Sequence, residues 1–401
     1  MNILFLNTTP NTGGAAIAAS RIAKAVEKKG IHTDHLYRPK NKISFLRFLW
    51  ERLIIFISNG FNREKLFQVS IANTGRDISK LDVVQNADII HMHWINQGFL
   101  SLTDLDELFQ LGKPIVWTMH DMWPCTGICH HSRECEKYQT RCNSCPFLRS
   151  NGQDISTSVF KKKEKIYKKG NITFVGCSQW LSNRANKSLL LKNKDVVSIP
   201  NPIDSSHFYP TVKEEARKEL RLPCGKILIL FGAANISNRR KGIDYLIKSL
   251  KMLKNANNIE LVVFGQTKED IQNLFPLTYH HLGYLSDTLK IMQMYNASDI
   301  FVTPSLEENL PNTIMEAMAC GTPCVGFNVG GIPEMIDHLK NGYVAKYKDA
   351  DDLAAGIEWV IENRETMHLS EACVKKVKEN YTEEIVADKY IKLYKSLLQN
   401  H

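Results

Sequence analysis

Short apolar runs alternate along this chain with longer stretches of helical periodicity, and this alternation limits the fold more than any other feature. Each run is bounded by polar, glycine or proline residues, as expected for a buried strand. Regular alternation of strand and helix signals is typical of parallel sheets whose strands are joined by crossover helices. The predicted strands are residues 3–6, 32–37, 88–91, 114–118, 172–175, 196–199, 226–231, 259–264, 280–284, 300–303 and 323–327.

The length of the chain indicates more than one domain. A chain of 401 residues is too long for one ordinary core and fits about two domains. A turn with two prolines, Pro200 to Asp204, separates the two series of alternating patterns. We therefore predict a first domain of residues 1–203, a second of residues 204–382, and a final helix of residues 383–401. In doubly wound sheets, ligands bind beyond the carboxyl ends of the strands.

The segment after the predicted strand at residues 300–303 contains several candidate binding groups. There a short polar turn leads into a helix. Glu308 lies in the turn and Glu316 on the helix. The backbone N–H groups of Asn309, Leu310 and the next few residues should point out of the helix start, which is a ready site for phosphate. The two carboxylates can accept hydrogen bonds from hydroxyls. Phosphate together with several hydroxyls describes a nucleotide sugar.

These residues also carry a family resemblance. Glu308 and Glu316 with residues 317–323, and then residues 330–336, resemble the donor-site motif of retaining GT-B glycosyltransferases, the group called family 4 or group 1. The resemblance implies an α/β protein with two Rossmann-like, doubly wound parallel-sheet domains facing a cleft. The first domain would take the acceptor and the second the donor. The helix of residues 383–401 would return to the first domain.

The resemblance also implies roles for single residues. Glu316 would hold the ribose of the donor, Asn309 and Leu310 its diphosphate, and Glu308 the transferred sugar. His120, in the segment Thr-Met-His-Asp-Met-Trp-Pro, matches a family histidine that contacts the donor sugar and stabilises the reacting centre. A lone histidine is more often structural. The nearby His91 is expected to be a satisfied core histidine, as is His93, although either could line the acceptor side.

A basic turn after the predicted strand at 226–231 supplies cations. Arg239, Arg240 and Lys241 precede Gly242 there, and cations beside a diphosphate would offset the charge on the departing nucleotide. The Lys-Gly pair matches the family motif. Many members carry an arginine directly after the strand-end glycine, whereas this chain has Ala233, so Arg240 is the candidate to supply that guanidinium. The alternative is a solvated basic turn.

The loop after the first strand contains two adjacent glycines, Gly13 and Gly14, before a helical pattern that starts at about residue 15. Glycines let the backbone approach a ligand closely, and the helix start adds N–H donors. A plain strand-to-helix turn would look the same. Within the resemblance, this loop approaches the donor phosphates and the acceptor.

Five of the ten cysteines cluster at Cys125, Cys129, Cys135, Cys142 and Cys145. Because the first residues form a strand pattern and not a secretion signal, we expect a reducing compartment, in which disulfides are rare. The last four cysteines resemble the ligand set of a structural zinc ion, since relatives tend to have an aromatic residue at position 125. His130 and His131 could substitute as ligands. Free thiols are the alternative, and no cofactor is expected for catalysis.

The net charge of +9 and the segment of residues 40–65 bear on partners and location. That segment interleaves basic residues with aromatic and aliphatic ones, and it is too short and too charged to span a membrane. Its part at residues 43–57 is either a helix lying on an anionic membrane surface or a core helix of the first domain. Nucleic-acid motifs do not accompany the charge. We expect a cytoplasmic protein, with peripheral membrane contact as one interpretation.

These features together predict a hexosyltransferase-type enzyme. It would move a sugar from a UDP- or GDP-sugar to a glycan or lipid-linked glycan during assembly of a bacterial surface polysaccharide such as O-antigen, capsule or exopolysaccharide. The resemblance implies front-face attack without an enzyme nucleophile. The alternatives are a nucleotide-sugar epimerase and a non-catalytic nucleotide-sugar-binding protein. A dinucleotide oxidoreductase would need a Gly-x-Gly-x-x-Gly fingerprint, which this chain lacks.

Overall fold

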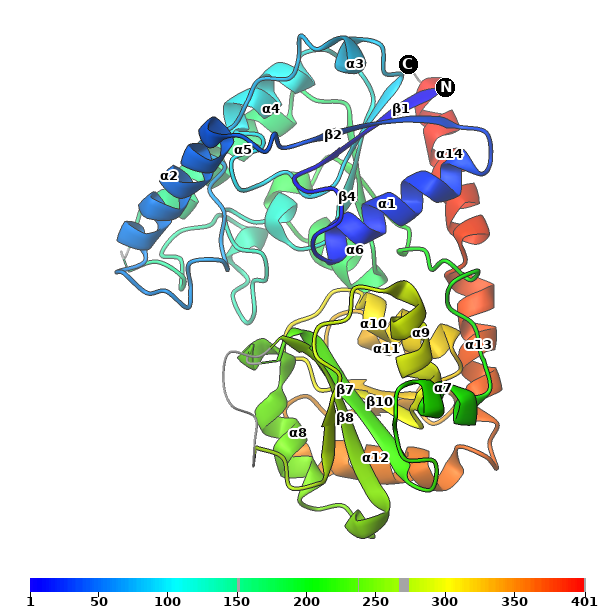
Figure 1. Cartoon of the computed structure of the whole chain (residues 1–401). Coiled ribbons are helices and arrows are strands. Elements are labelled where there is room, and N and C mark those ends of the chain that lie inside the picture. Colours follow the sequence, from blue (N-terminus) through cyan, green and yellow to red (C-terminus); the bar gives the residue numbers. More distant parts are fainter. Residues whose placement is uncertain (150–151, 237, 267–273, 400–401) are drawn as a thin grey trace. The chain divides into compact units, whose positions relative to one another are not determined.

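The computed structural model describes residues 1–149, 152–236, 238–266 and 274–399 (Figure 1). The chain forms two compact units. Unit 1 contains Met1–Asn201 and the residues from Val386 onward, and unit 2 contains Pro202–Ile385. Of the predicted segments, Ser237 in the basic turn and the last two residues of the final helix lie outside the described residues.

The described part of unit 1 is built on a six-stranded parallel sheet in the order β2-β1-β3-β4-β5-β6. Its strands are β1 (Asn2–Asn7), β2 (His32–Tyr37), β3 (Ile89–Met92), β4 (Ile115–Met119), β5 (Ile172–Gly176) and β6 (Asp195–Ser198). Its helices are α1 (Gly14–Glu27), α2 (Lys42–Ser58), α3 (Asp82–Gln85), α4 (Leu102–Phe109), α5 (Ile155–Tyr167), α6 (Gln179–Asn186) and α14 (Glu383–Gln399), with 3-10 turns at Trp123–Cys125, Lys137–Gln139 and Leu189–Leu191.

Alternate residues of each strand in unit 1 enter different cores. Ile3 and Phe5 of β1 pack with α1 and α14, whereas Leu4 and Leu6 pack on the side of α4 and α5. Helices therefore cover both faces of the sheet, as Figure 1 shows. A parallel sheet needs this cover because both of its faces are apolar.

Unit 2 repeats the architecture, with a six-stranded parallel sheet in its described residues in the order β12-β11-β10-β7-β8-β9. Its strands are β7 (Ile227–Asn235), β8 (Ile259–Gln266), β9 (Tyr279–His281), β10 (Ile300–Thr303), β11 (Cys324–Phe327) and β12 (Gly342–Ala345). Its helices are α7 (Lys213–Glu219), α8 (Ile243–Leu250), α9 (Thr288–Ala297), α10 (Asn312–Ala319), α11 (Ile332–Met335), α12 (Ala350–Asn363) and α13 (Leu369–Asn380), with 3-10 turns at Arg239–Lys241 and Ala256–Asn258. Helices α8 and α12 share one core with the sheet.

The final helix α14 belongs to unit 1 from Val386 onward. Val386, Ala387, Tyr390 and Tyr394 are buried against the sheet. The Tyr394 hydroxyl hydrogen-bonds His91 Nδ1 at 2.7 Å, and the Tyr390 hydroxyl hydrogen-bonds Thr118 Oγ1 at 2.9 Å. The helix thus completes the core on one face of a sheet whose strands lie far away in the sequence.

Candidate active site

The carboxyl ends of the neighbouring strands β7 and β10 present the predicted donor-side residues of unit 2. The chain leaves β10 at Thr303, forms the loop 304–311 and enters α10. Two glycines with positive φ pack against this loop. A Cβ on Gly242 would lie 1.8 Å from the Pro304 carbonyl oxygen, and one on Gly330 would lie 2.0 Å from that of Glu308. Only glycine fits these two positions, so the backbone around the loop is tightly fixed.

Lys241 and Glu308, both predicted catalytic residues, form an ion pair between the Lys241 ammonium and Glu308 Oε1. The Ser305 hydroxyl also donates to Glu308 Oε1, at 3.1 Å. The Glu308 side chain is 14% exposed and the Lys241 side chain 32% exposed. The pair is therefore partly shielded from water but open on one side, which strengthens its electrostatic interactions with any bound charge.

Arg240 lies beside a different acid, Glu307. Its Nη1 lies 3.8 Å from Glu307 Oε2, and its side chain is 41% exposed. Its backbone carbonyl accepts a 2.7 Å hydrogen bond from the Leu306 N–H, so the basic turn and the loop after β10 are joined directly. The structure brings Arg240 and Lys241 to the same loop, each beside its own glutamate. A phosphate-binding role for Arg240 stays a prediction.

Glu316 lies on α10 and is buried, with 9% of its surface exposed. Its Oε2 accepts a 3.2 Å hydrogen bond from the Tyr295 hydroxyl of α9. Burial raises the pKa of Tyr295 well above its ordinary value, and the neighbouring Glu316 carboxylate acts in the same direction. Asn309 and Leu310 are buried at the end of the loop. Tyr295 has no motif of its own in the sequence, so its contact with Glu316 was not predicted.

In unit 1, Gly13 has φ of 91° and caps α1, which begins at Gly14. The space around a Cβ on Gly13 is open. The loop lies between the carboxyl end of β1 and the start of α1, as the sequence predicts. Its contact with donor or acceptor stays a prediction.

Three histidines gather at the carboxyl ends of β3 and β4. His93 Nδ1 and His120 Nε2 are 2.9 Å apart and share a hydrogen bond. The His91 ring lies beside that of His93, with centroids 4.3 Å apart and planes tilted by 32°. Burial lowers the pKa of His120 to about 4 and holds the pKa values of His91 and His93 well below their ordinary range. All three imidazoles are neutral at physiological pH.

The members of this group differ in how their hydrogen bonds are satisfied. Both ring nitrogens of His91 have partners, Thr118 Oγ1 at 2.7 Å and the Tyr394 hydroxyl, so His91 is a satisfied core histidine as predicted. His93 Nε2 is buried without a hydrogen-bond partner among the described residues, so the prediction of a satisfied core histidine is wrong for His93. The pairing of His93 with His120 was not predicted, although each residue lies two positions after the end of a predicted strand.

Asp121 stabilises the next part of the loop through several hydrogen bonds. It accepts hydrogen bonds from Trp94 Nε1 at 3.1 Å and from the Trp123 backbone N–H at 2.8 Å, and its Oδ2 lies 2.6 Å from His130 Nδ1. The other ring nitrogen of His130 lies 3.1 Å from the Ser70 hydroxyl. Both nitrogens of His130 thus have protein partners, which leaves it poorly suited to replace a cysteine as a metal ligand.

The four cysteines chosen as zinc ligands line one small cavity of about 20 Å³. Cys125 lies apart from it and donates its S–H to the Met122 carbonyl oxygen at 3.2 Å. Burial raises the pKa of Cys142 to about 11 and of Cys145 to about 12, so without a metal these thiols are neutral. Within the described residues, no three cysteine, histidine, aspartate or glutamate side chains stand close enough together to hold one metal ion. The zinc site stays a prediction.

Comparison with known proteins identifies the family. The family described as Glycosyl transferases group 1 matches residues 212–379, and Glycosyltransferase Family 4 matches residues 12–207. The chain therefore belongs to the group 1 glycosyltransferases, with a family 4 amino-terminal half. Its predicted membership of this group is confirmed.

Relatives and a solved structure agree with this assignment. The N,N'-diacetylbacillosaminyl-diphospho-undecaprenol alpha-1,3-N-acetylgalactosaminyltransferase of Campylobacter jejuni is 31% identical over 218 residues, which are 53% of this chain and 57% of the relative. The match thus spans little more than half of that protein. The N-acetyl-alpha-D-glucosaminyl L-malate synthase of Bacillus anthracis is 26% identical over 98% of this chain and 96% of its own. Sucrose-phosphate synthase from Thermosynechococcus elongatus aligns over 100% of both chains, with a TM-score of 0.69 and 17% identity, which confirms the GT-B fold.

Proposed function

We propose that this chain transfers a sugar from a UDP- or GDP-sugar to a glycan or lipid-linked glycan acceptor. The observation that carries the proposal is the Lys241–Glu308 ion pair, which lies at the carboxyl ends of two neighbouring parallel strands and just before the start of α10. Ligands of doubly wound sheets bind at this edge. A cation, two acids and a helix start match the phosphates and hydroxyls of a nucleotide sugar.

The donor would reorganise the charges of this site. A diphosphate near Lys241 attracts the ammonium more strongly than one carboxylate does, because it carries more negative charge. Glu308 would then be available to accept hydrogen bonds from hydroxyls of the sugar. Glu316 is buried on α10, where its carboxylate can accept a hydrogen bond from a ribose hydroxyl. Lys241, and Arg240 beside it, would stabilise the charge on the departing nucleotide.

We propose transfer with retention of configuration. Glu308 Oε1 already takes a cation and the Ser305 hydroxyl, and such contacts lower the reactivity of a carboxylate as a nucleophile. The group that accepts the proton of the acceptor hydroxyl would then be the phosphate oxygen of the leaving group. The bond between that oxygen and the sugar breaks on the same face on which the acceptor oxygen forms its bond. NMR of the product reports the anomeric configuration directly.

The relative of Campylobacter jejuni supports one acceptor class, because its name describes a sugar on diphospho-undecaprenol. We propose a lipid-linked glycan of bacterial surface polysaccharide assembly as the acceptor of this chain, at the cytoplasmic face of the membrane. Neutral His120, which is half-buried at the sheet edge of unit 1 and held there by His93, can exchange hydrogen bonds with sugar hydroxyls without introducing charge. A small hydroxy acid, as in the malate synthase, is the competing acceptor class.

The test is a thermal-unfolding screen with UDP, GDP and their sugars, because a ligand that binds only the folded state raises stability. We expect one nucleotide series to raise the melting temperature, and Glu316→Ala to reduce that rise. The matched control is Glu379→Ala on α13, whose acid only approaches Lys375 at 3.9 Å. No stabilisation by any nucleotide at millimolar concentration would contradict the proposal. Analysis of products without an acceptor separates transfer from epimerisation of the donor.

A further inference from the structure

Helix α2 carries its polar residues inside and its apolar residues outside. Its buried residues are Ser44, Glu51, Arg52 and Ile55. Its outward side chains are large and apolar, each between 43% and 62% exposed: Ile43, Phe45, Leu46, Leu49, Trp50, Leu53 and Ile57. A surface helix of a soluble protein normally does the reverse, because its apolar side faces the core.

The buried charges hold the helix in this orientation. Glu51 Oε1 accepts hydrogen bonds from the backbone N–H groups of residues 71 and 72, at 2.9 and 3.0 Å. Arg52 donates to the carbonyls of Leu66 and Val69, at 2.7 and 3.1 Å, and lies 3.1 Å from Glu51 Oε2. Rotating the helix to bury its apolar side would break these contacts and strip two charges of their partners. The contacts of Glu51 and Arg52 therefore fix the apolar side of α2 toward the outside of unit 1.

The exposed apolar surface continues beyond the helix. Phe61 and Phe67, in the segment after α2, are 61% and 57% exposed. We call these two residues and the seven outward residues of α2 the apolar face. Between α2 and this segment lies an open hollow of about 620 Å³. Apart from Arg52, its lining is apolar: Leu46, Leu49, Trp50, Leu53, Phe56 and Leu66. Single exposed apolar residues are ordinary, but a contiguous surface of this kind marks an interaction site.

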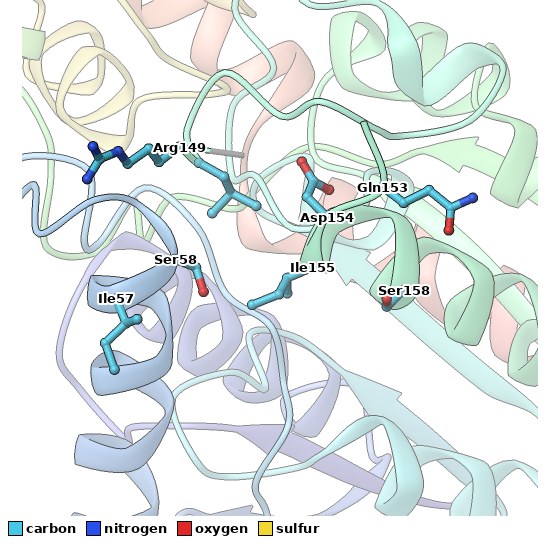
Figure 2. A pocket seen from close by; sticks show the side chains of 8 residues that line it. Ile57, Ser58, Arg149, Gln153, Asp154, Ile155 and Ser158 are labelled. Carbon is cyan, nitrogen blue, oxygen red and sulfur yellow. The ribbon is translucent and has the colours of Figure 1, made fainter. Parts of the chain in front are cut away.

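A second hollow, of about 670 Å³, adjoins the carboxyl end of α2. Ile57 of the apolar face borders it, as does Ile155 at the start of α5, and Figure 2 shows both with Gln153 and Ser158. Its lining mixes apolar and polar side chains, including Arg149. The apolar face thus ends at an open, partly polar recess that no predicted donor-site residue lines. A recess of this kind could accommodate a polar group of a ligand whose apolar part covers the apolar face.

The segment that carries the apolar face is also rich in cations. Five basic residues of the same segment are exposed or half-exposed: Lys40, Lys42, Arg47, Arg63 and Lys65. Among the described residues 40–67, the single exposed acid is Glu64. The surface therefore combines bulky apolar side chains with positive charge, which complements a surface that is both apolar and anionic.

We propose that the apolar face docks on an anionic lipid bilayer, with α2 lying in the boundary between head groups and acyl chains. Aromatic and aliphatic side chains would enter that boundary while the cations engage lipid phosphates. No helix in the described ranges is long and apolar enough to cross a membrane, so α2 lies on the bilayer. A second copy of the chain fits less well, because a symmetric contact would press the same cations together. The biological reason for docking rests on the proposed function with a lipid-linked acceptor.

The test is flotation of the full chain with vesicles of phosphatidylcholine alone and of phosphatidylcholine mixed equally with phosphatidylglycerol. We expect binding to the mixed vesicles that weakens with salt, and a blue shift of tryptophan fluorescence that Trp50→Phe reduces. The double variant Leu46→Glu/Leu49→Glu should bind roughly tenfold or more weakly. The matched control is Leu289→Glu on α9 of unit 2, where the leucine is 57% exposed; this variant should bind as the wild type does.

Three outcomes would overturn the proposal. They are wild-type protein that floats with neither vesicle, a double variant that floats as well as the wild type, and a self-associated wild type that the double substitution makes monomeric. Unchanged melting temperatures show that the variants fold. Thermal stabilisation by the nucleotide found for the wild type is measured on each variant, and it should persist. Vesicle binding without any nucleotide response would leave the docking surface standing while the proposed function fails.

Discussion

The two units present opposite chemistry at the same edge of similar sheets. In unit 2, the ends of β7 and β10 carry a charged pair, Lys241 and Glu308. In unit 1, the ends of β3 and β4 carry His93 and His120, which burial keeps neutral. Both sheets are parallel and six-stranded in their described parts, so the backbone architecture does not explain the contrast. The loops after the strands explain it, because their side chains set the local charge.

This contrast suggests a division of labour under the proposed function. A charged pair that is partly exposed, as in unit 2, suits a diphosphate, because the negative charge of the diphosphate grows as the sugar leaves. Neutral imidazoles suit sugar hydroxyls, since they exchange hydrogen bonds without attracting a competing ion. The following experiments test whether the two edges behave as differently as their electrostatics indicate.

The largest effect is expected at the charged edge. Lys241→Ala should lower kcat by about 100- to 1,000-fold, because it removes a cation from the leaving group and leaves Glu308 without its partner. Lys241→Arg should restore part of the rate. The control is Lys375→Ala, which removes an exposed lysine of α13. Steady-state rates with saturating donor measure the effect, and a near wild-type rate for Lys241→Ala would refute the assignment.

At the neutral edge we expect sensitivity to acid. Below pH 6.5 the unfolded chain takes up a proton that folded His120 binds only near its pKa of about 4. His120 therefore does not reduce the free energy of unfolding above pH 6.5, and it reduces that free energy progressively as the pH falls toward 4. The difference is at most about 3 kcal/mol. Urea unfolding of His120→Gln should depend less on pH across this window than unfolding of the wild type.

Tryptophan fluorescence is a suitable probe, because five of the six tryptophans lie in unit 1. His91 and His93 act in the same direction as His120, so the variant keeps part of the acid sensitivity. In activity assays from pH 5.5 upward, His120→Gln should change the rate without moving any inflection of the pH profile. An inflection near pH 6.5 that vanishes in His120→Gln would show that this histidine is not held neutral.

A smaller effect is expected for Glu316→Ala, which should weaken nucleotide affinity about tenfold through the loss of one hydrogen-bonding carboxylate. Tyr295→Phe should weaken it less, because it removes only a neighbour of that carboxylate. Calorimetric titration with the preferred nucleoside diphosphate measures both. Equal affinity of Glu316→Ala and wild type would remove Glu316 from the nucleotide site.

The smallest effect on rate is expected in the cysteine loop. If the four cysteines bind zinc, chelator-washed protein should retain about one zinc per chain. Cys142→Ser should lose it and change kcat little, whereas Cys177→Ser, a buried cysteine outside the loop, should retain it. Elemental analysis makes the measurement. Wild-type protein that contains no zinc would contradict the prediction of a zinc site.

The alternation of strand and helix patterns was enough to predict the architecture. A strand is present at each of the predicted positions. The central strands such as β3, β4 and β10 are buried along their whole length and read as apolar runs. The edge strands β2 and β9 are polar and only partly buried, and glycine or proline turns beside them helped to mark them. The strand β12 was missed. It is short, starts with Gly342 and is only partly buried, so its pattern differs little from that of a loop.

The candidate site could be predicted only where a motif fixed it. Glu308, Glu316 and Lys241 lie in such motifs, whereas the contacts of Tyr295 and the pairing of His93 with His120 depend on which strands are neighbours. The orientation of α2 was open for a similar reason. Apolar residues surround that helix on several sides, and the side that packs is chosen by Glu51 and Arg52 through bonds to residues 66–72. Periodicity alone does not contain that information.

The location of α14 has a consequence for how the protein is made. Tyr390 and Tyr394 fill one face of a sheet whose strands all precede residue 199. During synthesis the amino-terminal unit therefore emerges first but lacks part of its interior until residues 386–394 have been made. The carboxyl-terminal unit, a continuous stretch, has all of its residues sooner. A fragment ending near residue 201 would expose an uncovered apolar sheet and should aggregate, unless the missing helix is supplied as a peptide.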